Sequence, residues 1–233
     1  MSNGSGINRR MMLKGAVAGA AGLAMGHSVL DTAAWAADTT AGGKAVKTYK
    51  NEEFYKEGVF QQDKAKQAYW DMMKRFNYPI PPALEKGMWA IDFGLGDFVN
   101  VGMAGIFWCN NEKYSYFGHE IYLLPGQMIA EHGHKKTAKG PAKMEAWHVR
   151  HGLIYTFGEG EATGPAPIQL PESQKDAITS KKWKKVMPGE LDELTRPEAM
   201  HFMIAGPEGA IVTEYASFHD GDGLVFTNKK AKL

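Results

Sequence analysis

The sequence contains a single cysteine, Cys109, and it has almost no excess charge, with 27 Lys and Arg against 26 Asp and Glu in 233 residues. One cysteine excludes an intramolecular disulfide, so the fold depends on its apolar core and its hydrogen bonds. A net charge of +1, without a basic segment rich in aromatic residues, gives no sign of a nucleic-acid-binding surface. We therefore expect no nucleic-acid partner.

The sequence also lacks a hydrophobic run of transmembrane length, a repeat of fixed period and the glycine-rich motifs of nucleotide-binding folds. Its hydrophobic composition of 44% is nevertheless sufficient for one sizeable core. These features favour one globular domain, and we expect no stable membrane insertion of the mature chain.

The first 36 residues have the pattern of an export signal. Residues 8–14, NRRMMLK, resemble a twin-arginine motif, and a short Ala- and Gly-rich stretch follows them. Residues 34–36, AWA, place small residues where signal peptidase requires them. We predict a twin-arginine signal peptide over residues 1–36, a periplasmic location and a disordered lead-in over residues 37–50. The alternative is an Ala-rich cytosolic leader.

Residues 51–76 have a helical pattern, because Ala65, Tyr69, Met72 and Phe76 recur at three- and four-residue steps. From residue 87 onward, short apolar segments alternate with Gly, Asn and Pro-Gly turns, which is typical of strands. The expected strands are 89–93, 97–101, 106–110, 114–116, 120–124, 145–157, 184–187, 201–205 and 210–217. The pattern predicts a mainly β domain over residues 51–233, a sandwich or barrel with a helix packed outside it.

The most specific pattern in the chain is His132-Gly-His134, followed by Glu145. Side chains alternate faces along a strand, so the two histidines point to the same side. A glycine and a proline in the intervening ten residues predict a loop that returns the chain beside them. Two imidazoles and a carboxylate would then converge into a divalent-metal site. The alternative is a pair of surface histidines beside a Lys-rich loop.

The same stretch resembles the first motif of the cupin family, Gly, His-x-His, Glu and Gly, with Gly126 and Gly152 at its ends. His201, preceded by Pro197, resembles the second cupin motif, although the later Gly and Asn of that motif are absent. The resemblance implies a cupin (jelly-roll) β-barrel that holds a metal. The implied ligands are His132, His134, Glu145 and His201, and His219 is the rival for the fourth position.

Several fragments together resemble the D-lyxose ketol-isomerases: DFGLGDF at 92–98, LPGQ at 124–127, EHGH at 131–134, KME at 143–145, AGPEGA at 205–210 and EYAS at 214–217. The likeness spans most of the chain from residue 51 to residue 228. It implies a metal-dependent conversion of D-lyxose to D-xylulose, and of D-mannose to D-fructose, through an enediol. The implied cofactor is a divalent metal, commonly manganese, while zinc, cobalt and iron suit the same ligands.

The resemblance also implies roles for two further residues. Glu214 matches the family's Glu-x-x-Ser strand end and is the expected base for proton transfer between C1 and C2. Lys143 shares the strand face of Glu145 and is expected to stabilise the enediolate or to hold a sugar hydroxyl. Without the resemblance, the simpler interpretation is a surface carboxylate and a loop charge.

Substrate contacts are expected from Trp147 and His151, because they lie an even number of residues from Glu145 and so should point to the same face of the strand. Asp220 and Asp222 are candidates for binding terminal hydroxyls, and His219 in the same Gly- and Asp-rich loop is expected at a solvated rim. His119 stands where the resemblance leads us to expect lysine, a departure that bears on sugar preference. The expected partner is a small sugar, and pairing through sheet edges into a homodimer, frequent in cupins, is a further expectation.

Two other functions are compatible with the same ligands. A periplasmic metal-dependent dioxygenase predicts an apolar, aromatic-lined cavity, whereas sugar isomerisation predicts Lys, Glu and Asp converging on it. A non-enzymatic carbohydrate-binding cupin would keep the ligands but would not require Glu214 beside them. The combination of Lys143, Glu145 and Glu214 favours the isomerase.

Overall fold

The structure is a computed structural model, and it describes residues 45–233. The predicted signal peptide and residues 37–44 of the predicted lead-in lie outside the described residues. Residues 45–50 contain no helix or strand, and the ring of Tyr49 packs 5.4 Å from that of Phe54. No helix within residues 45–233 is both long and apolar enough to span a bilayer.

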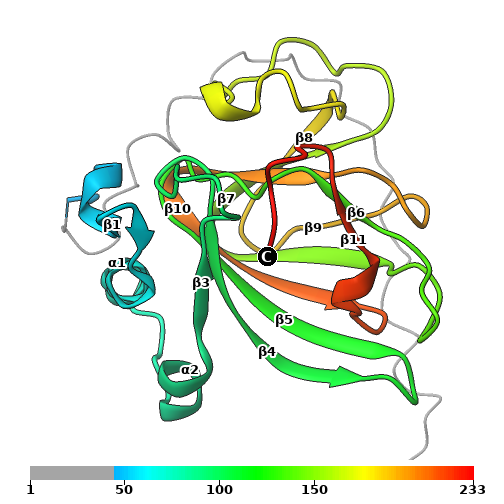
Figure 1. The fold of residues 1–233 in the computed structure, drawn as a ribbon, viewed down its shortest axis with the longest axis horizontal. Coiled ribbons are helices and arrows are strands. Elements are labelled where there is room, and N and C mark those ends of the chain that lie inside the picture. Colours follow the sequence, from blue (N-terminus) through cyan, green and yellow to red (C-terminus); the bar gives the residue numbers. More distant parts are fainter. Residues whose placement is uncertain (1–44) are drawn as a thin grey trace, which may run out of the picture. The chain divides into compact units, whose positions relative to one another are not determined.

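The main sheet has seven antiparallel strands, in the order β3-β4-β5-β10-β7-β8, with β9 also paired to β7 (Figure 1). These strands are β3 (Trp89–Ile91), β4 (Met103–Asn111), β5 (Tyr116–Leu123), β7 (Glu145–Gly158), β8 (Lys182–Val186), β9 (Leu191–Glu193) and β10 (Phe202–Ala216). β10 lies between β5 and β7 and pairs with both of them. The mainly β prediction is confirmed.

A separate two-stranded sheet carries the His-Gly-His sequence. It consists of β6 (His132–His134) and β11 (Leu224–Phe226), paired antiparallel so that Phe226 lies opposite His132. Isolated bridges join Met128 to Ile204 and His132 to His201. The small sheet is therefore attached by its main chain to the beginning of β10.

The chain before the main sheet forms several short elements, where the sequence predicts one helix over residues 51–76. It forms η2 (Asn51–Phe54), a hairpin of β1 (Tyr55–Lys56) and β2 (Val59–Phe60), then α1 (Gln62–Arg75) and α2 (Pro82–Gly87). The prediction of a helix from residue 51 is wrong for its first turns, because Glu57 and Gly58 have φ values of 53° and 78° and turn the chain back. Two later short helices are η3 (Glu172–Gln174) and η4 (Gly221–Gly223).

The two faces of the sheet have different neighbours. On one face, Tyr69 and Met72 of α1 are buried with Tyr122 of β5 and Ile211 of β10, and Figure 1 shows α1 and α2 beside this face. The opposite face is buried in a second cluster, which includes Ile121, the neighbour of Tyr122. Alternation along each strand therefore separates a helix-covered face from an inner face, and the site lies on the inner face.

Two expected strands are turns instead. Residues 97–100 form a hydrogen-bonded turn, in which the Asp97 side chain accepts from Asn51 and Asn100. Residues 112–115 form the turn between β4 and β5. The strands expected at 201–205 and 210–217 are one continuous strand, β10, with an irregular register between Ala205 and Ala210.

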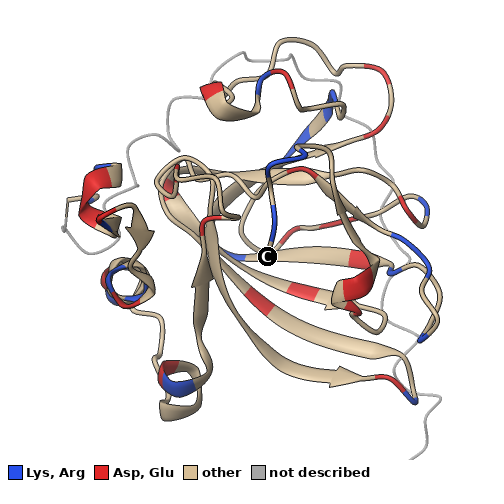
Figure 2. Cartoon of the chain, viewed as in Figure 1, with Lys and Arg blue, Asp and Glu red and all other residues tan. Residues whose placement is uncertain are grey.

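Figure 2 shows Lys and Arg interspersed with Asp and Glu over the helices, strand ends and loops of the described chain. Three acidic side chains within the sheet are buried, Glu120 of β5, Glu145 of β7 and Glu214 of β10. Glu120 faces the helices and accepts hydrogen bonds from Tyr78, Tyr122 and Thr213. Glu214 faces the opposite way, and its neighbours are charged.

Candidate active site

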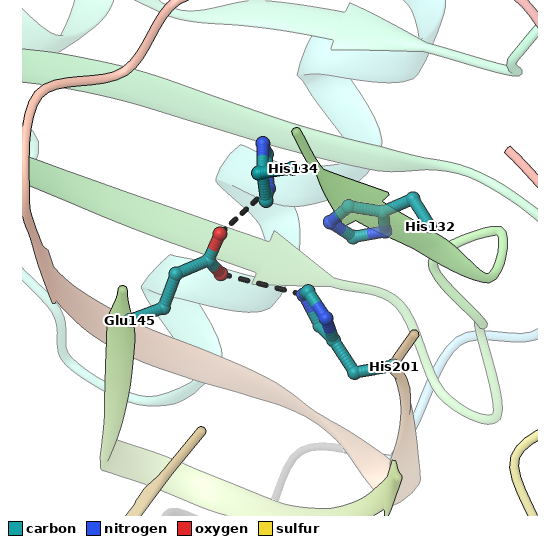
Figure 3. A group of neighbouring side chains, drawn as sticks. All are labelled: His132, His134, Glu145 and His201. Atoms are coloured by element: carbon teal, nitrogen blue, oxygen red, sulfur yellow. Dashed lines mark ion pairs between the residues drawn. The ribbon is translucent and has the colours of Figure 1, made fainter. Parts of the chain in front are cut away.

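Three histidines and one glutamate converge on the inner face of the sheet (Figure 3). His132 and His134 lie on β6, Glu145 begins β7, and His201 immediately precedes β10. One nitrogen or oxygen of each lies within 4.8 Å of those of the others. The structure thus brings together the four expected ligands, while the rival His219 lies outside this group.

The main chain orients two of these imidazoles. His132 and His201 exchange two backbone hydrogen bonds, of 3.0 and 2.8 Å. The Nδ1 atoms of His132 and His201 each lie 2.9 Å from a carbonyl oxygen, that of Ala130 and Ala199 respectively. A neutral imidazole that donates from Nδ1 keeps the lone pair of Nε2 free for a metal.

The inward atoms of the cluster lack hydrogen-bond partners among residues 45–233. The buried atoms without a partner are both nitrogens of His134, Oε1 of Glu145 and Nε2 of His201. His134 Nε2 and Glu145 Oε1 lie 2.6 Å apart, yet without the geometry of a hydrogen bond. Buried polar atoms are normally paired, and a divalent cation would satisfy one nitrogen of His134 together with Glu145 Oε1 and His201 Nε2. The residues therefore fit a metal ion.

The electrostatics of the cluster also favour a cation. Burial, together with His201 and His134, holds the pKa of His132 well below its usual value. Burial alone would raise the pKa of Glu145, but Lys143, His134 and His201 hold it well below the usual range. Burial would lower the pKa of His201, yet the attraction of Glu145 raises it. The carboxylate of Glu145 and the neutral imidazole of His132 are the forms that bind a metal, and at His201 a bound cation would take the place of the proton that Glu145 attracts.

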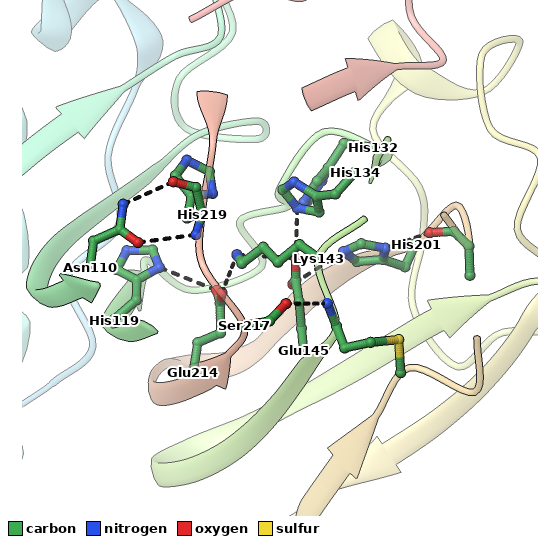
Figure 4. A network of polar contacts seen from close by, with 12 residues as sticks. Asn110, His119, His132, His134, Lys143, Glu145, His201, Glu214, Ser217 and His219 are labelled. Atoms are coloured by element: carbon green, nitrogen blue, oxygen red, sulfur yellow. Dashed lines mark hydrogen bonds and ion pairs between the residues drawn. The ribbon is translucent and has the colours of Figure 1, made fainter. Parts of the chain in front are cut away.

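A second polar group lies next to the ligands (Figure 4). Lys143 Nζ is 3.1 Å from Glu145 Oε1 and 2.5 Å from Glu214 Oε1, and His119 Nδ1 is 3.2 Å from Glu214 Oε2. All four side chains are buried. Burial would raise the pKa of Glu214, but Lys143 and the hydrogen bond with His119 outweigh it and lower the pKa to about 2. Glu214 is therefore a carboxylate near neutral pH, the form that accepts a proton.

The ligands, Lys143 and Glu214 line one cavity of about 350 Å³. Trp147 lines it as expected, with its ring 5.1 Å from that of His201. Much of the remaining wall is aromatic or aliphatic and includes Phe107, Phe117 and Met103. The cavity thus combines the converging Lys and Glu expected for isomerisation with the apolar lining expected for a dioxygenase.

His151, a predicted substrate contact, does not line the cavity. His151 lies on the helix-covered face, where its ring stacks 5.4 Å from that of Phe76 and meets Tyr78 at 5.7 Å. The register between β7 and β10 shifts at this point, since Val149 pairs with Val212 but His151 with Ile211. Arg150 is one additional residue in β7. Because of it, His151 faces away from the cavity, although it is an even number of residues from Glu145 and Trp147, which face the cavity.

Two histidines have larger parts in the site than the sequence indicates. His119 hydrogen-bonds with Glu214, a pairing that depends on β5 lying next to β10. His219, expected at a solvated rim, lines the cavity and stacks 5.3 Å from Phe117. Burial, with Lys143 and His134 nearby, lowers its pKa to about 4. No local sequence signal marks either residue, because both depend on contacts between distant segments.

Asp220 and Asp222 do not line the cavity. Both face Lys139, whose Nζ lies 3.3 and 3.1 Å from their carboxylate oxygens. Neither aspartate is therefore placed to bind a sugar hydroxyl, and the cavity has fewer polar groups than the sequence predicts.

Comparison with known proteins relates the chain to sugar isomerases. A D-lyxose/D-mannose isomerase of Thermosediminibacter oceani is 32% identical over 163 residues, which are 70% of this chain and 88% of that protein. A D-lyxose ketol-isomerase of Cohnella laeviribosi is 28% identical, over 70% of this chain and 87% of that protein. No family model matches the sequence.

Solved structures give the fold. An L-ribose isomerase of Cellulomonas parahominis, determined with L-psicose, superposes with a TM-score of 0.57 at 13% identity, covering 72% of this chain and 91% of that one. An Acinetobacter L-ribose isomerase in complex with L-ribose gives 0.55, also at 13% identity, covering 72% and 92%. The fold is cupin-like, its ligand cluster fits a metal ion, and the relatives in sequence identify the class of protein as a sugar ketol-isomerase. The chain belongs to the D-lyxose ketol-isomerase family.

Proposed function

We propose that the protein interconverts D-lyxose with D-xylulose, and D-mannose with D-fructose, using a divalent metal with manganese as first choice. The observation that carries this proposal is the pair Lys143 and Glu214, buried within hydrogen-bond distance of each other and beside Glu145 of the ligand cluster. A binding protein has no need of a buried carboxylate held ionised at this position. An oxygenase has no need of an acid–base pair there.

The metal would be held by His132, His134, Glu145 and His201. When bound, it supplies positive charge that stabilises an oxyanion on O1 or O2 of the sugar. Glu214 accepts the proton from C2 of the open-chain aldose. The electron pair of that C–H bond forms the C1–C2 double bond, while the π electrons of the C1 carbonyl move onto O1 and give the enediolate. The same carboxylic acid returns the proton to C1, while the proton of the C2 hydroxyl passes to O1. The product is the ketose.

Lys143 and His119 act on Glu214 in different ways. The ammonium of Lys143 keeps the carboxylate ionised before proton transfer and stabilises negative charge on the substrate oxygens. His119 holds the other carboxylate oxygen and so fixes the rotation of the group. Trp147 supplies an apolar surface beside the ligands, suited to the C–H face of a sugar.

The test is ketose formation from D-lyxose and D-mannose by the full chain, stripped with EDTA and reloaded with manganese, zinc, cobalt or iron(II). We expect xylulose and fructose only after metal is restored, with manganese giving the highest rate. Metal bound in stoichiometric amount without turnover of either sugar would refute the isomerase and return the dioxygenase and the binding protein to consideration.

We further propose that the seven-stranded sheet and the β6–β11 pair together close a jelly-roll barrel. The bridges from Met128 to Ile204 and from His132 to His201 support closure. For the whole chain we propose a twin-arginine signal over residues 1–36, a disordered lead-in over residues 37–50 and the cupin domain with its N-terminal helix over residues 51–233, exported to the periplasm. The motif NRRMMLK supports export.

We also propose that the protein forms a homodimer, and size-exclusion chromatography with light scattering tests this proposal.

A further inference from the structure

The cavity is unevenly supplied with polar groups. Glu214, Lys143, His119 and the metal ligands come from β5, β10, β6 and the beginning of β7. In the strand order β3-β4-β5-β10-β7, the edge strand β3 lies three strands from β10. Because neighbouring strands are about 4.8 Å apart, Glu214 of β10 and strand β3 lie on different parts of the wall. His119 of β5 lies between them, with its ring 5.6 Å from that of Trp89 of β3.

Apart from Trp89, the side chains that line the cavity from β3 and the segments beside it are apolar. We define the apolar wall as Ile91, Phe93, Met103 and Phe226, all of which line the cavity. Ile91 and Met103 are opposite each other in the β3–β4 pair, and the rings of Phe93 and Phe226 lie 5.7 Å apart. The backbone groups of β3 and β4 pair with each other. A hydroxyl that faces the apolar wall therefore finds no side-chain partner there.

An open-chain aldose bound by O1 and O2 near Lys143 and Glu214 extends its remaining carbons along the cavity. If its last carbon carries a hydroxyl, contact with the apolar wall removes water from that group without a replacement hydrogen bond. If the last carbon is a methyl group, the same contact buries apolar surface favourably. The expected polar partners for a terminal hydroxyl, Asp220 and Asp222, face Lys139 instead.

We propose that the preferred substrates are deoxy aldoses whose terminal carbon is a methyl group, bound with that methyl on the apolar wall. This inference rests on the proposed isomerase function of the same cavity. It names a substrate class that the proposed reaction on D-lyxose and D-mannose does not include. 6-Deoxy-D-mannose is the direct probe, because it differs from D-mannose only by loss of the terminal oxygen.

The first experiment compares kcat/KM for 6-deoxy-D-mannose and D-mannose with the full chain loaded with manganese. We expect the deoxy sugar to be favoured by about tenfold or more, since a misplaced hydroxyl or a matched methyl group changes discrimination by at least that factor. Equal values, or a preference for D-mannose, would overturn the inference while leaving the isomerase function intact.

A second measurement does not depend on turnover. D-Mannitol and 6-deoxy-D-mannitol are open-chain analogues without a carbonyl, and their dissociation constants can be measured by calorimetry on the metal-loaded protein. Tighter binding of the deoxy alditol, by about tenfold, supports the apolar wall even if no aldose is converted. Equal or weaker binding of the deoxy alditol would count against it whatever the outcome for the isomerase proposal.

Variants locate the effect. Met103→Gln adds an amide to the apolar wall at similar side-chain length, and it should reduce the preference for the deoxy sugar to about threefold or less. Met103→Leu is the matched control and should retain the wild-type ratio of the two sugars. Ile91→Thr, on the paired strand, provides a second polar substitution if Met103→Gln proves unstable in thermal unfolding. An unchanged ratio in both folded polar variants would place the terminal carbon elsewhere.

Discussion

The imidazole of His119 occupies the space that the missing side chain of Gly105 leaves. A Cβ atom at Gly105 would overlap His119 Nε2, and it would lie 2.9 Å from both a carbonyl oxygen of Glu120 and the ring of Trp89. The backbone of Gly105 is not in the left-handed region, so alanine is compatible with its conformation. This glycine serves to make room for the residue that holds Glu214.

We expect Gly105→Ala to displace His119 and to lower kcat by about 10²-fold, because misplacing a catalytic group by about 1 Å costs that much. Bound metal, measured by plasma mass spectrometry, should be unchanged. Gly118→Ala is the matched control, since its Cβ would meet the sulfur of Cys109 at 3.1 Å, away from Glu214. Full activity of Gly105→Ala would show that His119 does not position the base.

Glu214→Gln should bind metal as the wild type does and lose turnover by about 10²- to 10⁴-fold, because the amide cannot accept the C2 proton. Hydrogen–deuterium exchange at C2 of the sugar in deuterated solvent should fall in parallel. Rates equal to the wild type would remove Glu214 from proton transfer. Glu120→Gln, a change in a buried carboxylate on the helix-covered face, shows how much of any loss comes from altered packing.

Stability in acid should report on the same carboxyl. Its pKa is lowered from 4.5 to about 2 in the folded protein. The unfolded chain therefore binds the proton more tightly, so this group stabilises the fold above about pH 4.5, and the contribution is lost as pH falls towards 2. The shift corresponds to about 3 kcal/mol at most.

The measurement is urea unfolding in EDTA at intervals from pH 6 to pH 2.5. The free energy of unfolding of the wild type should fall more steeply below pH 4.5 than that of Glu214→Gln. Parallel curves for the two proteins would show that Lys143 and His119 do not hold this carboxyl ionised.

Removal of the metal should lower thermal stability through linkage. With free metal at about 100 times its dissociation constant, the folded state gains about 3 kcal/mol, which EDTA should abolish. His134→Ala should bind metal weakly and show little further destabilisation by EDTA. His148→Ala, on strand β7 and partly exposed, should behave as the wild type. Wild-type metal content in His134→Ala would contradict the ligand set.

Alternation along single strands was sufficient to group His132, His134, Glu145 and Trp147, because each relation is local. The same rule failed at His151, where one additional residue in β7 shifts the register, and nothing in the sequence marks that residue. The hairpin before α1 was missed because Glu57, not only Gly58, adopts a left-handed conformation.

Contacts between strands were the least predictable part of the site. The partnership of His119 with Glu214 joins residues 95 positions apart and depends on the register of β5 against β10. His219 was expected at the rim, since its loop is rich in Gly and Asp, but its ring stacks on Phe117. The apolar wall combines residues of β3, the turn after it, β4 and β11, whose adjacency only the fold establishes.

The reciprocal backbone bonds between His132 and His201 have a consequence for redesign. Those bonds belong to the main chain, so they persist when either imidazole is exchanged for another side chain. The backbone therefore holds position 201 in place whatever its side chain. Cysteine there would make the ligand set softer and aspartate would make it harder, without a change in the backbone hydrogen bonds. Metal selectivity in this protein can thus be changed one donor at a time.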